Sequence, residues 1–149
     1  MKHKIYKIAS GIKLEDELVK SINDLLKHLS PNNYAVSKKR FRELLDNHLL
    51  EIYLLESNEG IVGMGSLHFF KTLVKNSVWI EDVVVHPTQR RKGYGKKIIE
   101  HMISQAKKRG AHHIDLSSRN DRAESHKFYQ KLNFEKRDTS VYRRKLKKK

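Results

Sequence analysis

The stretch that decides the fold is residues 83–96, VVVHPTQRRKGYGK. Val83, Val84 and Val85 are typical of a strand, Pro87 marks its end, and a basic glycine loop then leads into a helix. A helix start presents unpaired backbone N–H groups and about half a positive charge, so anions bind there. The sequence therefore predicts a cradle for a phosphorylated ligand, built from Arg90, Arg91, Lys92, Gly93, Tyr94, Gly95 and Lys96.

The two glycines lack Cβ, so we expect both to take backbone angles closed to other residues and to bring their amides against phosphate oxygens. The loop has no GxxxxGK[ST] pattern, which excludes a Walker P-loop. It also lacks the third glycine of a dinucleotide fingerprint. The pattern that fits, Arg90-x-x-Gly93-x-Gly95 after a strand, resembles the pyrophosphate-binding motif of the GNAT superfamily of acyl-CoA-dependent N-acetyltransferases.

A second motif supports this resemblance, because FYQKLNF at residues 128–134 is similar to the family's F-Y-x-K-x-G-F. Asn133 stands where the family has Gly, and Asn is the next best residue for a left-handed helix end. The resemblance covers residues 50 to 146. The strand IEDVVV at residues 80–85 is also similar to that of glucosamine-phosphate acetyltransferases.

The resemblance implies an α/β fold of GNAT type, with a mixed, mostly antiparallel sheet flanked by helices on both faces. It implies direct transfer of an acetyl group from acetyl-CoA, as co-substrate, to a primary amine within a ternary complex. The backbone N–H of Val83 would bind the oxyanion, Val85 would pair with the pantetheine arm beside Val84, and Tyr129 would protonate the thiolate. Asn120 would contact the cofactor, although it lies two residues before the position usual for the family.

Two carboxylates, Glu81 and Asp82, interrupt an otherwise apolar strand. Removing the proton from an amine with a pKa of about 10.4 calls for a base, and burial in a strand would raise a carboxylate pKa toward the useful range. Neighbouring strand residues point to opposite faces unless a bulge intervenes, so one of the two should face the acceptor. We favour Glu81, which matches a carboxylate of the glucosamine-phosphate relatives, and leave Asp82 as the alternative.

Length and composition indicate one domain, residues 1–146, followed by a basic tail at 147–149. No apolar run is long enough to cross a membrane and no signal-like core follows the basic start, so we expect a cytoplasmic protein. The chain has no Cys, which excludes a disulfide and an acetyl-cysteine intermediate. His112 and His113 would face opposite sides of a strand, so we expect no metal site.

The net charge is +15, and it is still +9 without the six cations of the last seven residues. Such a surface attracts coenzyme A and nucleic acid alike. It favours acidic or phosphorylated small amines over polyamines and cationic peptides as acceptors, and small-molecule and peptide amines both remain open. Two alternatives to the enzyme are a nucleic-acid-associated basic module and a non-catalytic acetyl-CoA-binding domain. The sequence leaves a homodimer open.

Apolar periodicity predicts the remaining elements. Strands are expected at 3–9, 50–56, 61–70, 78–85, 112–116 and 140–146, the second and third forming a hairpin. Helices are expected from Leu14 to Leu29, from Ser37 (as N-cap) to His48, after Gly95 as far as Gly110, and from Arg122 to Leu132.

Overall fold

The structure, a computed structural model, describes residues 2–146. They form two compact units, one ending at Ser117 and one beginning at Ser118. The basic tail predicted at 147–149 lies outside the described residues.

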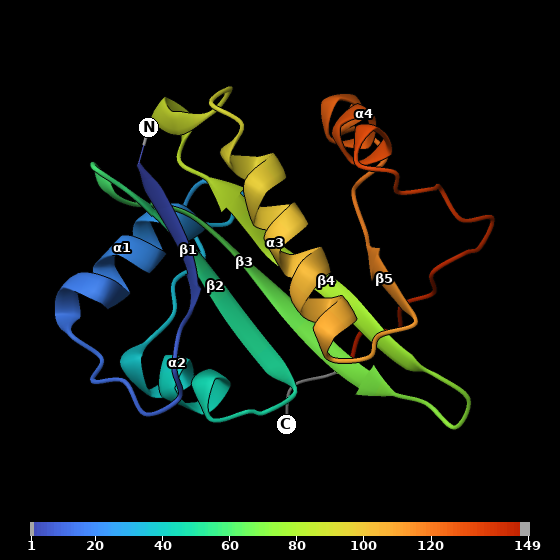
Figure 1. Ribbon diagram of the computed structural model, residues 1–149, viewed down its shortest axis with the longest axis horizontal. Coiled ribbons are helices and arrows are strands. Elements are labelled where there is room, and N and C mark those ends of the chain that lie inside the picture. Colours follow the sequence, from blue (N-terminus) through green and yellow to red (C-terminus); the bar gives the residue numbers. More distant parts are fainter. Residues whose placement is uncertain (1, 147–149) are drawn as a thin grey trace. The chain divides into compact units, whose positions relative to one another are not determined.

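The first unit is built on a five-stranded sheet with the order β1-β2-β3-β4-β5 (Figure 1). The strands β1 to β4 pair antiparallel, and β4 pairs with β5 in parallel, so the sheet is mixed and mostly antiparallel as predicted. Its elements are β1 (His3–Lys7), α1 (Asp16–Leu26), α2 (Lys38–Leu45), β2 (Leu50–Ser57), β3 (Gly60–Lys71), β4 (Asn76–Val85), a 3-10 turn (Pro87–Gln89), α3 (Tyr94–Lys108) and β5 (His113–Leu116).

One face of the sheet is covered by α1 and α2. Their apolar stripes, which include Ile22, Leu25 and Phe41, pack against Leu54 and Met64 of the sheet in one hydrophobic core. The helix α2 begins where its N-cap was predicted, because the Ser37 hydroxyl accepts a hydrogen bond from the Arg40 N–H at 3.1 Å.

The other face is covered by α3, which lies across β2, β3 and β4 (Figure 1). Its approach is close because β3 carries glycines beneath it. A methyl group on Gly63 would lie 2.8 Å from Ile98 Cδ1, and one on Gly65 would lie 2.9 Å from Met102 Cε. The predicted arrangement of helices on both faces is confirmed.

The second unit contains α4 (Ala123–Lys131), which ends in a Schellman motif. The Phe134 N–H donates to the Tyr129 carbonyl at 3.1 Å, and the Asn133 N–H donates to the Gln130 carbonyl at 3.0 Å. Asn133 has φ 63°, so the predicted left-handed asparagine is confirmed. The ring of Phe134 packs on that of Tyr129, which is the apolar contact that accompanies this motif.

The strand predicted at 140–146 is wrong, because those residues have no regular secondary structure. Val141 and Tyr142 are 80% and 92% exposed. Their side chains therefore bury too little apolar surface to offset the entropy lost when a strand is ordered.

Candidate functional site

The glycine loop connects β4 to α3 through two left-handed residues. These are Arg91, with φ 62°, and Gly93, with φ 78°. Gly95 lies within α3 and is not among the residues with positive φ, so the prediction of unusual backbone angles is right for Gly93 and wrong for Gly95. The first backbone bond of the helix runs from the Lys97 N–H to the Gly93 carbonyl, and the N–H groups of Gly95 and Lys96 precede it at the positive end of the helix.

A buried glutamine ties this loop to the hairpin between β2 and β3. Gln89 is only 3% exposed, and its amide Nε2 donates to Glu59 Oε2 at 2.5 Å. Lys92 Nζ donates to Gln89 Oε1 at 2.7 Å and lies 3.8 Å from Glu59. Neither Gln89 nor Glu59 was predicted from the sequence as a site residue, since neither belongs to a recognisable motif.

The four predicted cations of the loop divide into two kinds. Arg90 donates through Nε to the Val85 carbonyl at 3.2 Å, and Lys92 holds Gln89, so these two stabilise the loop itself. Lys96 makes an exposed pair with Glu100 at 3.7 Å, which contributes little in water. Within the described part of the chain, Arg91 is exposed and its side chain makes no hydrogen bond or ion pair. Arg91 and Lys96 are therefore the cations available to an incoming anion.

Tyr94 anchors the start of α3. It is buried, and its ring lies 5.9 Å from that of His3 and 6.0 Å from Lys97 Nζ. The structure therefore places this predicted binding residue in the packing that fixes the helix N-terminus.

Beyond Ile80, β4 leaves β5. The parallel ladder between them covers Ser77–Ile80 of β4, and in residues 2–146 no strand pairs with residues 81–85 on that side. Val83 and Val85 are half-buried along this segment, whereas the side chain of Val84 lies in the core beneath α1. The edge leads directly into the glycine loop, so an extended ligand could follow it toward the helix N-terminus.

A β-bulge in β4 places both candidate carboxylates on one face of the sheet. Ser66 pairs with Glu81 and Met64 with Val84, so β4 carries one residue more than β3 between these pairs. Asp82 takes a left-handed conformation with φ 56°, and its Oδ2 accepts a hydrogen bond from Ser66 Oγ at 3.0 Å. Because Ser66 and its strand partner Glu81 point to the same side, the Asp82 carboxylate lies on that side too.

Both carboxylates are exposed, so the prediction that one of them is buried in the strand is wrong. A bulge bends its strand, and each carboxylate is instead fixed by a hydrogen bond. Glu81 Oε1 accepts one from the Trp79 indole N–H at 2.7 Å. Such fixed hydrogen bonds orient the carboxylates without removing them from water.

Ser66 and His68 complete this polar cluster, and neither was predicted from the sequence as a site residue. Ser66 is 2% exposed, and its Oγ also lies 3.2 Å from His68 Nε2 and 3.2 Å from the Glu81 carbonyl oxygen. The available signal was the alternation of polar Ser66 and His68 in an otherwise apolar strand, since alternate residues share one face.

An open groove of about 470 Å³ adjoins the cluster. The residues that line it include Asn47, Leu49, His68, Phe70, Trp79 and Glu81. It combines an aromatic and apolar wall with one of the two carboxylates, which is a typical composition for a small-molecule site.

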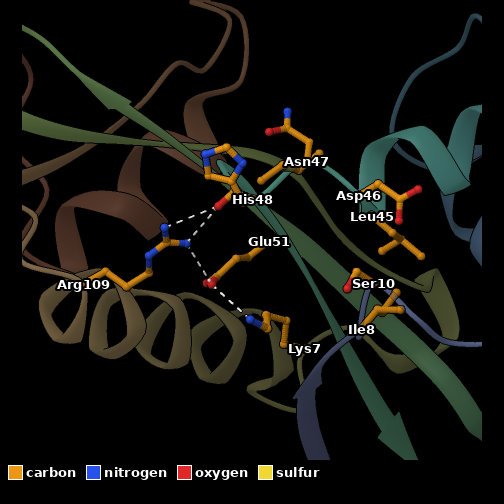
Figure 2. A pocket seen from close by; sticks show the side chains of 10 residues that line it. Lys7, Ile8, Ser10, Leu45, Asp46, Asn47, His48, Glu51 and Arg109 are labelled. Carbon is orange, nitrogen blue, oxygen red and sulfur yellow. Dashed lines mark hydrogen bonds and ion pairs between the residues drawn. The ribbon is translucent and has the colours of Figure 1, made fainter.

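A second pocket, of about 360 Å³, lies at the C-terminal end of α3 and contains a charged network (Figure 2). Glu51 Oε1 lies 3.3 Å from Lys7 Nζ and 3.0 Å from Arg109 Nη1, and Glu51 also accepts a hydrogen bond from the Tyr53 hydroxyl. Arg109 reaches the His48 carbonyl as well (Figure 2). In the part of the chain that the structure describes, no buried side-chain polar atom lacks a partner, so this network is complete as it stands.

The pKa values of three side chains in and beside this network are shifted. Burial alone would raise the pKa of Glu51, but hydrogen bonds from Tyr53 and Lys7, with the charges of Lys7 and Arg109, hold it below its ordinary value. Burial and the Glu51 carboxylate raise the pKa of the Tyr53 hydroxyl. Burial, helped by the charge of Lys108, lowers the pKa of His101, whose ring packs on Tyr53 at 5.2 Å.

The histidine pair at 112–113 is engaged in ordinary contacts. His112 Nδ1 accepts a hydrogen bond from the Asn76 N–H at 3.0 Å, and His113 Nε2 lies 3.2 Å from Asp115 Oδ2. Among the described residues no group of three or more His, Cys, Asp or Glu side chains could hold a metal ion.

Two predicted site residues, Asn120 and Tyr129, belong to the second unit. Asn120 is exposed and precedes α4, and Tyr129 is half-buried within that helix. The ring of Tyr129 packs edge-on against Phe128 at 5.2 Å and Phe134 at 5.8 Å. These aromatic contacts hold the Tyr129 ring within this unit.

No helix among the described residues is long and apolar enough to span a membrane.

Sequence comparison adds two findings. Residues 19–134 match the model of the acetyltransferase (GNAT) family. A relative from Bacillus subtilis (strain 168), the uncharacterized N-acetyltransferase YhdJ, is 38% identical over 52 residues, which are 35% of this chain and 37% of that protein. The match therefore spans little more than a third of the relative's length.

Solved structures resemble the whole fold. A putative acetyltransferase from Agrobacterium tumefaciens str. C58 has a TM-score of 0.82 at 20% identity and covers 95% of this chain and 99% of its own. The aminoglycoside acetyltransferase meta-AAC0020, from an uncultured soil metagenomic sample, has a TM-score of 0.81 at 16% identity, covering 97% of each chain. Glucosamine-6-phosphate N-acetyltransferase from Arabidopsis thaliana has a TM-score of 0.75 at 23% identity, covering 97% and 99%. At these identities the likeness shows the fold alone.

Proposed function

Because the chain belongs to the GNAT acetyltransferase family, we propose that it moves the acetyl group of acetyl-CoA to a primary amine by direct attack in a ternary complex. The observation that carries this proposal is the junction of the unpaired β4 edge with the positive N-terminus of α3. An edge suited to an extended arm leads there into a site suited to a pyrophosphate.

In this proposal the loop binds the pyrophosphate of acetyl-CoA. The first-turn N–H groups of Gly95 and Lys96 would donate to phosphate oxygens, and the exposed side chain of Arg91 would add a charge-assisted contact. The left-handed turn at Gly93 aims the helix start, and Gln89 and Lys92 keep the loop in place. The pantetheine arm would pair with the backbone of β4 through Val85.

The reaction begins when a base on the enzyme takes a proton from the acceptor ammonium. The neutral nitrogen attacks the thioester carbonyl, a C–N bond forms, and the carbonyl oxygen becomes an oxyanion that the Val83 N–H would stabilise. Collapse of this intermediate breaks the C–S bond and releases the CoA thiolate. Tyr129 would give the thiolate its proton, leaving an N-acetylated amine, which loses its extra proton, and free CoA.

Glu81 is our first choice of base and Asp82 the second. Each is fixed by a hydrogen bond, on the same face of the sheet, beside the groove. An ammonium can approach either carboxylate, because both are exposed. Two neighbouring carboxylates would bind the cationic form of the acceptor and place a proton acceptor within reach of its ammonium group.

The nature of the relatives supports an amine acceptor. The solved structures of similar fold include enzymes whose names specify aminoglycosides and glucosamine 6-phosphate, which are amines. The relative from Bacillus subtilis is named as an N-acetyltransferase. The polar cluster at the β4 bulge also suits an amine acceptor, since its carboxylates can accept a proton from an amine.

The test is thermal unfolding of the purified protein with and without acetyl-CoA, with ATP and NAD as anionic controls. At a hundredfold excess over the dissociation constant, binding adds about 2.7 kcal/mol of stability, which raises the melting temperature by several degrees. A rise confined to acetyl-CoA, followed by acetylation of an amine, supports the proposal. Equal rises with all three anions indicate a general basic surface, and acetyl-CoA binding without turnover of a broad amine panel indicates a non-catalytic domain.

A further inference from the structure

We infer that the acceptor is an unphosphorylated primary amine carried on a flat, apolar body, bound in the groove beside the β4 bulge. This inference rests on the proposed function and names its substrate class. The groove is the cavity of about 470 Å³ that adjoins Glu81 on the α1–α2 face of the sheet. All the residues that carry the argument belong to the first unit.

The carboxylates are the reason to expect an amine at one end of the acceptor. Glu81 lines the groove, and the bulge brings Asp82 to the same face through its hydrogen bond to Ser66. None of the residues that line this groove is Lys or Arg. The groove therefore attracts an ammonium group and offers no Lys or Arg side chain to a phosphate.

This local charge outweighs the net charge of the chain. The excess of 15 positive charges acts over the whole surface, but at physiological ionic strength such charges are screened within about 8 Å. A ligand inside the groove meets Glu81 directly, and Asp82 lies on the same face of the sheet. The expectation of an acidic or phosphorylated acceptor, drawn from net charge, is therefore replaced by one drawn from the groove.

The body of the acceptor is set by the apolar wall. Trp79 lines the groove, and Phe70 and Leu49, also in its lining, are 42% and 38% exposed. The hydrogen bond from the Trp79 indole to Glu81 holds the ring in one orientation before a ligand arrives. A preoriented aromatic wall beside a carboxylate fits an aromatic ring joined to an amine by a short chain.

The chain offers a direct probe, because Trp79 is its only tryptophan. Intrinsic fluorescence of the full-length protein therefore reports on the groove independently of turnover. We would titrate 2-phenylethylamine, ethylamine and O-phosphoethanolamine, and then measure kcat/KM for acetylation of each. We expect a saturable fluorescence change with 2-phenylethylamine alone, and a kcat/KM about tenfold or more above that for ethylamine. O-phosphoethanolamine should be the poorest substrate.

A matched pair of variants separates groove contact from a general effect. Phe70→Ala should lower the preference for 2-phenylethylamine over ethylamine about fivefold. Leu73→Ala removes a fully exposed apolar side chain from the turn between β3 and β4, outside the groove lining, and should leave that preference unchanged.

The outcomes distinguish this inference from the proposed function. A preference for O-phosphoethanolamine, or equal kcat/KM for 2-phenylethylamine and ethylamine, overturns the inference and leaves the acetyltransferase intact. Saturable binding of 2-phenylethylamine with no acetylation of any amine overturns the proposed function and keeps the assignment of the groove. An unchanged preference in Phe70→Ala also overturns the inference.

Discussion

Replacing Gly93 with alanine should damage both folding and cofactor binding, whereas the same change at Gly110 should damage folding alone. The two glycines flank α3 and have φ 78° and 72°. A Cβ at either position would meet no heavy atom within 4 Å, so the substitution creates no clash. Its cost is confined to the left-handed backbone.

The size of the effect follows from this geometry. A residue with Cβ in the left-handed region costs about 1–2 kcal/mol, and the lower entropy of the unfolded alanine chain returns part of it. We expect each variant to lose about 1 kcal/mol of stability, or roughly 3 °C in melting temperature. If Gly93→Ala turns the first-turn amides away from the phosphates, it also loses a charge-assisted hydrogen bond, worth about 1.5–3 kcal/mol, or ten- to a hundredfold in affinity.

The assays are thermal unfolding and isothermal titration with acetyl-CoA, run on both variants and on the wild type. Gly110→Ala is the matched control, because it places the same strain at the C-terminal end of the same helix. Unchanged acetyl-CoA affinity in Gly93→Ala would refute the assignment of the loop as the pyrophosphate site. Equal losses of affinity in both variants would show that the effect passes through the stability of α3.

Four further results are expected. Whichever of Glu81→Gln and Asp82→Asn removes the base should lower kcat by about a hundredfold or more without weakening acetyl-CoA, and wild-type pH–rate profiles in both would exclude both from that role. Tyr129→Phe keeps the ring contacts and should lower kcat by about a hundredfold at constant acetyl-CoA affinity; full activity would remove its assignment as the acid. The pKa of Glu51 in the folded protein lies below its ordinary value of 4.5. Ionised Glu51 therefore stabilises the folded state fully above about pH 4.5, and this stabilisation is lost as the pH falls through the folded pKa. Glu51→Gln should lower stability at neutral pH by about 1–3 kcal/mol and flatten this acid dependence in urea titrations, and an equally steep curve would contradict it. Asn133→Gly removes the backbone strain of a left-handed asparagine and should raise stability by about 0.5 kcal/mol. A lower urea midpoint in this variant would show that Asn133 is not strained.

Local chemistry let the sequence predict several features correctly. Ser37 caps α2, Gly93 turns left-handed at the start of α3, and Asn133 ends α4, because a cap or a tight turn depends on the few residues that form it. The hairpin and the apolar stripes of the helices follow from periodicity in the same way. Family motifs, which are also local strings, led from these features to the right fold.

The strand predicted at 140–146 shows where that reasoning ends. These residues include apolar Val141, Tyr142 and Leu146, but a strand needs a neighbour and a buried face, and the exposed Val141 and Tyr142 have no burial to stabilise one. The burial expected of Glu81 fails for a related reason. Whether a residue in an apolar strand is covered depends on what packs against it, and the sequence of the strand does not contain that information.

The sequence by itself determined the glycine loop at the start of α3, the order of the elements as far as α4 and the presence of two carboxylates in β4. Only the tertiary structure decided that both carboxylates lie on the same face of the sheet, since this depends on one residue gained by β4 relative to β3 and on a hydrogen bond from Ser66, 16 positions earlier in the chain than Asp82. It likewise brought Gln89 to Glu59 and Glu51 to Arg109. Register and side-chain pairing arise between segments distant in the chain, so no local pattern could encode them.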